Sequence, residues 1–194
     1  MVIRCKHSEN GCEYVGVKEV MQSHEESCLF RNVECPKFTC DEKLQVRFAI
    51  DHLKNSHKCD ENKGPLISHF ENEISDQNGT YNPNIILFDG QKFLQHCIVK
   101  RNIWRIWVTV LGDGKLAQNY EAKFNIPEDG ARGTPASLSF KGKVYSADIE
   151  KDYVQEDHEG ILDFPSTLAL KLGDDFDADG EFKIHYKCQI QHTS

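Results

Sequence analysis

Eight residues in the first third of the chain form a metal-ligand pattern that occurs twice. The first copy has the spacing C-x6-C-x11-H-x3-C, and the second has the spacing C-x4-C-x11-H-x4-H. Thiolate and imidazole groups are ligands that tetrahedral zinc prefers, and each copy supplies four of them. The first copy consists of Cys5, Cys12, His24 and Cys28, and the second of Cys35, Cys40, His52 and His57. We therefore predict two structural zinc ions per chain, with no coordination position left for a catalytic water.

The spacing also predicts the elements that position these ligands. The last two ligands of each copy lie about one helical turn apart, which sets both on one face of a helix. Apolar periodicity predicts helices over residues 17–26 and 44–55. Their apolar residues are Val17, Val20 and Met21 in the first helix and Val46, Phe48, Ile50 and Leu53 in the second. Units of this size bury too little surface to fold alone, so we expect the metal to supply the folding free energy.

The cysteines could have roles other than zinc binding. Eight cysteines could form a disulfide framework in a secreted protein, and a lone cysteine is most often a buried small hydrophobe. Disulfides would leave the histidines of the two quartets without a role, and the charged start of the chain lacks the apolar region of a signal peptide. We therefore expect reduced cysteines and a protein of the cytoplasm, or also of the nucleus, that is not secreted. Cys59 is an alternative to His57 as the last ligand, although the x4 spacing of His57 matches one helical turn better.

Charge and hydropathy exclude two classes of partner. The formal net charge of −8 argues against a nucleic-acid-binding protein. The first predicted helix carries carboxylates where a DNA-reading finger would carry basic and amide side chains. No apolar run is long enough to span a membrane. We expect neither nucleic acid nor a membrane as a partner.

From about residue 85 the apolar residues alternate with polar ones. This pattern predicts strands over residues 104–110, 122–126, 138–145 and 182–190, with turns that contain glycine or proline between them. One short helix is a candidate at residues 165–172. We predict a mostly β protein, with an antiparallel β-sandwich over residues 85–194. Two zinc fingers over residues 1–60 precede it, and residues 61–84 form a linker with a first edge segment.

Several segments resemble one known family. CKHSENGCEYVGVKEVMQSHEESC, VECPKFTC and AIDHLKNSH resemble the paired zinc fingers of the seven-in-absentia (Siah-type) E3 ubiquitin ligases, apart from a shorter first gap in the second finger. VTVLGDGKLAQNYEAKFNI and EGILDFPSTLALKLGDDF resemble the TRAF-like substrate-binding sandwich of that family. The resemblance implies that the two quartets hold zinc. It also implies that the sandwich binds short peptide segments of client proteins, which are then ubiquitinated and degraded by the proteasome, and that it forms homodimers.

The chain departs from complete Siah-type ligases in one respect. Those ligases carry a RING domain, which needs closely spaced C-x2-C pairs, and this sequence contains none. We expect the chain to recruit substrates, to be inactive alone in ubiquitin transfer, and to use a conjugating enzyme only if a RING is supplied elsewhere. Two possibilities stay open. The chain is part of a RING-containing ligase, or it is a RING-less scaffold or adaptor with no role in ubiquitin transfer.

The family resemblance places the peptide groove early in the sandwich. We predict that Ile85, Leu87, Phe93 and Leu94 line it, with a turn at Asp89-Gly90 between the two strands. Each of the four could instead belong to the sandwich core. Residues 85–88 are all apolar, however, and cannot all face inward from a strand that is exposed on one side. Some of them should face a partner or another part of the chain.

Three further patterns in the sequence are weaker indications of function. Asp175, Asp177 and Asp179 match the opening of a calcium-binding EF-hand loop, but Tyr186 stands where the bidentate glutamate belongs, and a solvated acidic turn accounts for the same residues. Asn78 begins a glycosylation sequon, which we interpret as a turn. The remaining histidines lie at no recognisable spacing from a nucleophile, so no catalytic residue is predicted.

Homodimerisation is expected through the sandwich, supported by the apolar strand at residues 182–190.

Overall fold

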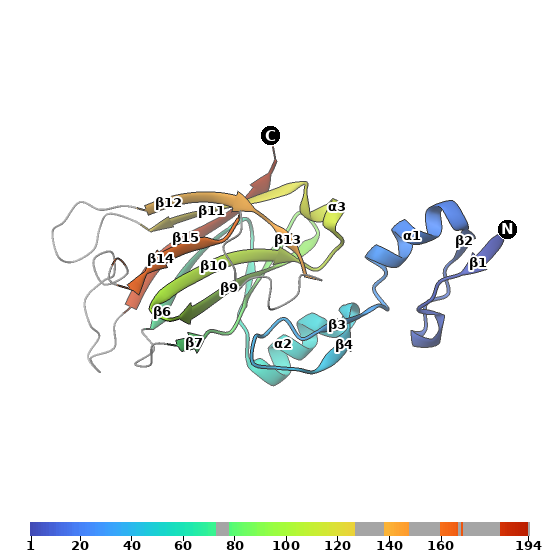
Figure 1. Ribbon diagram of the computed structural model, residues 1–194, viewed down its shortest axis with the longest axis horizontal. Helices are drawn as coiled ribbons and strands as arrows, with labels where there is room; N and C mark the ends of the chain where they lie inside the picture. Colours follow the sequence, from blue (N-terminus) through green and yellow to red (C-terminus); the bar gives the residue numbers. More distant parts are fainter. Residues whose placement is uncertain (73–77, 127–137, 148–159, 167, 169–182, 194) are drawn as a thin grey trace.

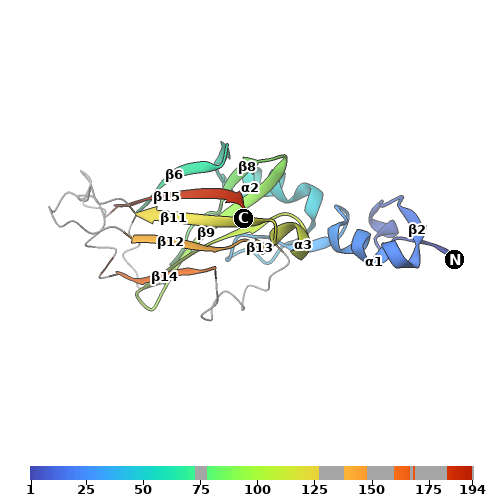
Figure 2. The same ribbon diagram turned by 90° about the horizontal axis from the view of Figure 1, so that it is seen from above.

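The chain folds into two small fingers followed by a β-sandwich (Figure 1). A computed structural model describes residues 1–72, 78–126, 138–147, 160–166, 168 and 183–193. Figures 1 and 2 show that the first finger projects from one end of the molecule, whereas the second finger lies against the sandwich. Within the described parts, none of the helices has the length and apolar character needed to cross a lipid bilayer.

The first finger is a small hairpin followed by a helix. Strand β1 (Val2–Arg4) pairs antiparallel with β2 (Val15–Val17), and the 3-10 turn η1 (Ser8–Asn10) lies between them. Helix α1 (Lys18–Ser27) follows directly, close to the predicted bounds. Met21 is buried as expected, but Val17 and Val20 are 43% and 46% exposed. The predicted apolar face is wrong for these two valines, because cysteines and Met21 fill the interior of this finger.

The second finger repeats this plan with a shorter helix. Strand β3 (Asn32–Glu34) pairs with β4 (Lys43–Gln45), and the 3-10 turn η2 (Val46–Phe48) leads into helix α2 (Ala49–His57). The helix therefore begins five residues later than predicted, because the residues before it are taken up by the hairpin and the turn. Val46, Ile50 and Leu53 are buried as expected. Phe48 is 48% exposed and lies 4.4 Å from the Arg47 guanidinium, so it is not a core residue.

The sandwich consists of two sheets that are joined by α3 (Gly114–Ala117) between β10 and β11. The first sheet contains β5 (Glu61–Lys63), β7 (Asn78–Thr80), β8 (Asn84–Phe88), β9 (Gln91–Lys100), β10 (Ile103–Val110), β13 (Tyr145–Ser146) and β14 (Leu162–Pro165). The second has the order β12-β11-β15-β6, from β12 (Leu138–Lys143), β11 (Tyr120–Ile126), β15 (Lys183–His192) and β6 (Leu66–Asn72). The described pairings are antiparallel, except for the short pairs β5–β8 and β10–β13.

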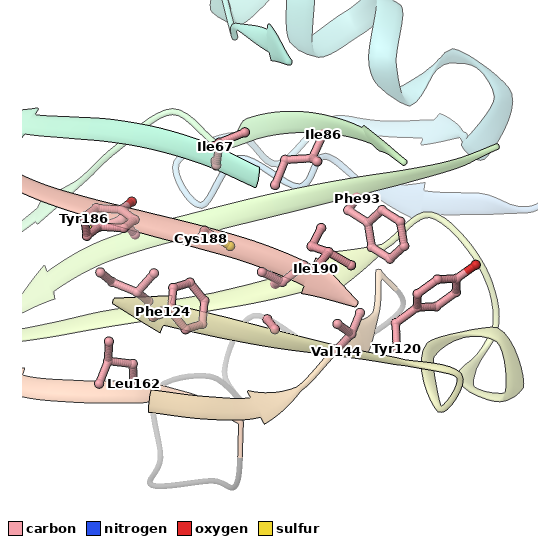
Figure 3. Close-up of a cluster of buried hydrophobic side chains, with 14 of the residues drawn as sticks. Ile67, Ile86, Phe93, Tyr120, Phe124, Val144, Leu162, Tyr186, Cys188 and Ile190 are labelled. Atoms are coloured by element: carbon pink, nitrogen blue, oxygen red, sulfur yellow. The ribbon is translucent and has the colours of Figure 1, made fainter. Parts of the chain in front are cut away.

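Alternate side chains of both sheets form the main core. In Figure 3 Ile86 and Phe93 from the first sheet face Phe124, Cys188 and Ile190 from the second. The predicted period of two is confirmed in β10, where the core residues are Trp104, Ile106, Val108 and Val110. The hairpin between β8 and β9 is also confirmed. Asp89 and Gly90 have φ values of 52° and 68°, as the right-handed twist of a two-residue hairpin loop requires.

Five expectations differ from the structure or lie outside its described residues. The predicted linker contains β5, β6 and β7, so it belongs to the sheets, and the sequon at Asn78 is a strand and not a turn. Strand β15 lies between β11 and β6, so it offers no open edge for a dimer. Most of the predicted helix at residues 165–172 and most of the acidic loop at residues 175–186 lie outside the described residues.

Candidate metal centres

The first quartet converges on one point. Cys5 follows β1, Cys12 follows η1, and His24 and Cys28 lie on and just after α1. The Sγ atoms of Cys5 and Cys28 are 3.9 Å apart, and Cys12 Sγ lies 3.3 Å from His24 Nε2. All four ligand atoms lie within 4.8 Å of one another. The three cysteines are buried, so the surrounding protein shields them from solvent.

The second quartet is built in the same way. Cys35 follows β3, Cys40 precedes β4, and both histidines belong to α2. The Nε2 atoms of His52 and His57 face each other at 3.0 Å. Cys35 Sγ lies 3.4 Å from His57 Nε2, and Cys40 Sγ lies 3.8 Å from His52 Nε2.

Both arrangements fit tetrahedral zinc. Two ligands of a tetrahedron are separated by about 1.6 bond lengths, so Zn–S bonds of about 2.3 Å and Zn–N bonds of about 2.0 Å predict separations of about 3.3–3.8 Å. The five distances above run from 3.0 to 3.9 Å. Each site supplies four protein ligands and leaves no position for water or substrate. The two zinc ions would therefore be structural, and they would stabilise the fingers rather than take part in a reaction.

Burial affects the ionisation of one cysteine of the first quartet, Cys28. Burial raises the pKa of the Cys28 thiol to about 11. A thiol in this position keeps its proton at neutral pH until a cation replaces it. The main-chain amide of His7 already points at Cys5 Sγ, 3.4 Å away, as a donor to a thiolate.

Cys59 lies outside both clusters. Its side chain is buried beside the second finger, among apolar residues. Its main-chain amide donates a 3.1 Å hydrogen bond to the carbonyl oxygen of Leu53, and Lys58 before it has a φ of 57°. This arrangement ends helix α2 with the left-handed residue Lys58. The ligand atoms that converge in the second quartet come from Cys35, Cys40, His52 and His57.

Comparison with known proteins finds similar E3 ubiquitin-protein ligases. No family model matches the chain. The chain is 24% identical over 167 residues to the E3 ubiquitin-protein ligase SINAT3 of Arabidopsis thaliana, covering 81% of this chain and 50% of the relative. It is 22% identical over 167 residues to the E3 ubiquitin-protein ligase DIS1 of Oryza sativa subsp. japonica, covering 81% and 54%. Together with the two zinc clusters, these matches support a similarity to the Siah-type E3 ubiquitin-protein ligases. The chain spans about half the length of these relatives.

The residues predicted to line the peptide groove are mostly core residues. Ile85, Phe93 and Leu94 are 0% exposed, and Leu87 is half-buried. Phe93 belongs to the core between the sheets, whereas Ile85 and Leu94 pack on the other face of the first sheet. The prediction that these three residues line a pocket open to a peptide is therefore wrong. The reason is that the second finger covers the outer face of β8 and β9.

This covering accounts for the run of four apolar residues, 85–88, in β8. Leu44, Ala49, Ile50 and Leu53 of the second finger form one buried cluster with Ile85 and Leu94. Phe38 of the same finger packs against a second cluster that contains Ile98 and Trp107. The first sheet is thus buried on both faces. The prediction that some of residues 85–88 contact another part of the chain is confirmed, and that part is the second zinc finger.

Two residues that support the metal ligands were missed in the sequence. Tyr14 stacks on the imidazole of His24, with ring centroids 3.8 Å apart. The Glu42 carboxylate lies 3.6 Å from Nδ1 of His52, on the side away from the metal-binding Nε2. Each contact helps to fix the orientation of the histidine ring. Each stands two residues after the second cysteine of its quartet, a shared offset that could have revealed them.

Proposed function

We propose that this chain is the zinc-binding substrate-recognition region of a Siah-type ubiquitin-protein ligase. It recruits client proteins through short peptide segments, and these clients are then ubiquitinated and degraded by the proteasome. The observation that carries the proposal is the extent of the similarity. Relatives named as E3 ubiquitin-protein ligases match 81% of the chain. Structural zinc sites and a sandwich without a predicted catalytic group suit binding better than chemistry.

A sheet edge is the natural place for a client segment. An extended peptide that adds to an edge gains main-chain hydrogen bonds, and pockets for alternate side chains give selectivity. Among the described strands, β6 and β12 each pair on one side only, so they are the edges of the second sheet. Both lie on the sheet that the second finger leaves uncovered. A TRAF-like mode of peptide recognition would use such an edge.

The remaining partners follow from the same proposal. A conjugating enzyme would be engaged only through a RING, in the same polypeptide or in an associated one. The chain would form homodimers and act in the cytoplasm, or also in the nucleus. Nucleic acid and membranes are not expected as partners, because the formal net charge is −8 and no described helix could span a bilayer.

The proposal is tested by supplying the missing activity. The chain is fused to an active RING domain and expressed in cells, and protein abundance is measured with and without a proteasome inhibitor. Proteins that bind the chain alone should become less abundant with the fusion and recover with the inhibitor. The matched control is the same fusion with Cys40→Ser, which should lose the second zinc and destabilise the sandwich that the second finger covers.

Two outcomes separate the proposal from its alternative. The chain without a RING should not discharge ubiquitin from a conjugating enzyme. If proteins bind the chain but their abundance is unchanged by the RING fusion, the chain is a scaffold or adaptor with no role in ubiquitin transfer.

A further inference from the structure

A cleft of about 620 Å³ opens where α3, β11, β12 and the start of β14 meet. Its floor is apolar and buried, and includes Ala117, Tyr120, Val144 and Ile161. Its rim is exposed and polar, and includes Gln118, Lys141, Lys143 and Thr193. Figure 3 shows two floor residues, Tyr120 and Val144, at the same end of the sandwich core. An apolar floor with a few polar groups around it is typical of a ligand-binding cleft of this size.

One wall of the cleft is made of closely packed backbone. A Cβ atom on Gly142 would lie 2.5 Å from the Cα atom of Gly160, and one on Gly160 would lie 2.9 Å from the amide nitrogen of Lys143. The chain that enters β14 therefore lies directly against β12. Gly160 also has a φ of +93°, which favours glycine. Because main chain sets this wall, its shape is fixed before any ligand binds, and less ordering entropy is lost on binding.

The sheet face beside the cleft is positively charged. The outward side chains of β11, β12 and β15 include Lys123, Lys141, Lys143 and Lys187, which are all exposed. Glu121 is the one acidic residue among the described outward positions of these strands, and it is held by Lys141 at 2.6 Å and by Gln191. Four lysines therefore stand against one glutamate, in a chain whose formal net charge is −8. A local field of this sign attracts and orients an acidic partner.

We propose that this cleft and the lysine face beside it bind an acidic segment of a client protein, which inserts one large apolar side chain into the cleft. This inference rests on the proposed function and names the class of segment that it recognises. Carboxylates are favoured over nucleic acid, because the described outward positions of these strands carry no aromatic or arginine side chain on which a base could stack. Strand β12 ends its sheet among the described strands, so an extended segment can lie along it.

The test uses the zinc-loaded chain and a synthetic peptide. The probe is the fluorescein-labelled nonapeptide Glu-Ser-Glu-Glu-Leu-Glu-Glu-Ser-Glu, and its Kd is measured by fluorescence anisotropy. Replacing the central leucine by serine should weaken binding at least about tenfold, since the cleft then buries no apolar side chain. Replacing every glutamate by lysine should abolish it. Raising the salt from low concentration to about 0.15 M should weaken it, because exposed charges are screened.

Three variants locate the site on the protein. Thr193→Trp places a large side chain at the mouth of the cleft and should weaken peptide binding at least about tenfold. Lys123→Glu reverses one charge of the lysine face and should weaken binding about threefold to tenfold. Lys92→Glu makes the same charge change on β9 of the other sheet and should leave Kd unchanged. Zinc content and thermal unfolding show whether each variant is folded.

The outcomes distinguish this inference from the proposed function. Unchanged peptide binding in folded Thr193→Trp and Lys123→Glu variants would show that the peptide does not bind at the cleft and the lysine face. Tighter binding of an oligodeoxythymidine than of the peptide, lost in Lys123→Glu, would assign the face to nucleic acid instead. If the peptide binds as expected but the RING fusion degrades nothing, the cleft stands as a binding site and the role in ubiquitination fails.

Discussion

The main-chain amide of Ile85 donates a 2.9 Å hydrogen bond to the carbonyl oxygen of Asp60. Asp60 follows directly after the second finger, and Ile85 lies in β8 of the first sheet, so this bond joins the two units where their apolar surfaces meet. The first finger has a different attachment. Its link to the sandwich includes the Arg31 guanidinium, which donates to the carbonyl oxygen of Gly112 at 3.3 Å. The two zinc ions should therefore contribute differently to the stability of the sandwich.

Removing one zinc at a time tests this difference. Cys12→Ser and Cys40→Ser should each reduce the zinc content from two ions per chain to one. Only Cys40→Ser should also lower the unfolding temperature of the sandwich, because the second finger covers Ile85 and Leu94. Metal analysis and the fluorescence of Trp104 and Trp107 during heating measure the two effects. Cys59→Ser is the control and should retain both zinc ions, whereas a loss of one ion would make Cys59 a ligand.

The same interface predicts the effect of a core truncation. Ile85→Ala should reduce the free energy of unfolding by about 2–5 kcal/mol, because a fully buried side chain leaves a cavity between finger and sheet. Val20→Ala is a control on α1, where the side chain is 46% exposed, and it should change the value by less than about 0.5 kcal/mol. Denaturant unfolding at fixed zinc concentration measures both. An equal effect of the two substitutions would contradict the packing of the second finger on this sheet.

Local and long-range features of this fold differ in how well the sequence predicts them. The two zinc quartets are predictable because ligand chemistry and the turn of a helix fix the spacing of nearby residues. The alternation in β10 and β15 is predictable for the same local reason. The packing of Phe38 and Leu53 on the sandwich is not, because nothing in their local pattern states which surface they bury. The groove prediction failed at Ile85 for this reason. An apolar run must be buried, but its pattern does not indicate which part of the chain, or which partner, buries it.

Association of two chains can be predicted from the edges of the second sheet. Strand β12 carries exposed Lys141 and Lys143, which would repel their copies across a two-fold axis. Strand β6 carries the exposed Leu66, so the resemblance to a dimeric family favours pairing through β6. Light scattering at micromolar concentration should give a dimer mass, and Leu66→Glu should give a monomer. A dimer mass that survives Leu66→Glu but not Lys141→Glu would move the interface to β12.

A buried histidine makes the stability of the sandwich depend on pH. His96 is enclosed in β9, where its Nε2 lies 2.9 Å from Thr109 Oγ1 and its ring stacks on Trp107. Burial lowers the pKa of His96 from 6.5 to about 3. The folded state therefore keeps this imidazole neutral, while the unfolded state takes up a proton as the pH falls below 6.5. The contribution of the neutral His96 to the free energy of unfolding is fully present above pH 6.5. It declines by about 1.4 kcal/mol per pH unit below that, until the pH approaches the pKa of the folded state.

The variant His96→Gln isolates this contribution. It keeps a polar side chain beside Thr109 but has no group that titrates in this range. Between about pH 7.5 and pH 5 the wild-type chain should lose about 2 kcal/mol more of its free energy of unfolding than the variant does. Acid release of zinc affects both proteins, so it cancels in their difference. Denaturant unfolding at the two pH values gives the comparison, and a difference that does not change with pH would mean that His96 takes up its proton in the folded protein.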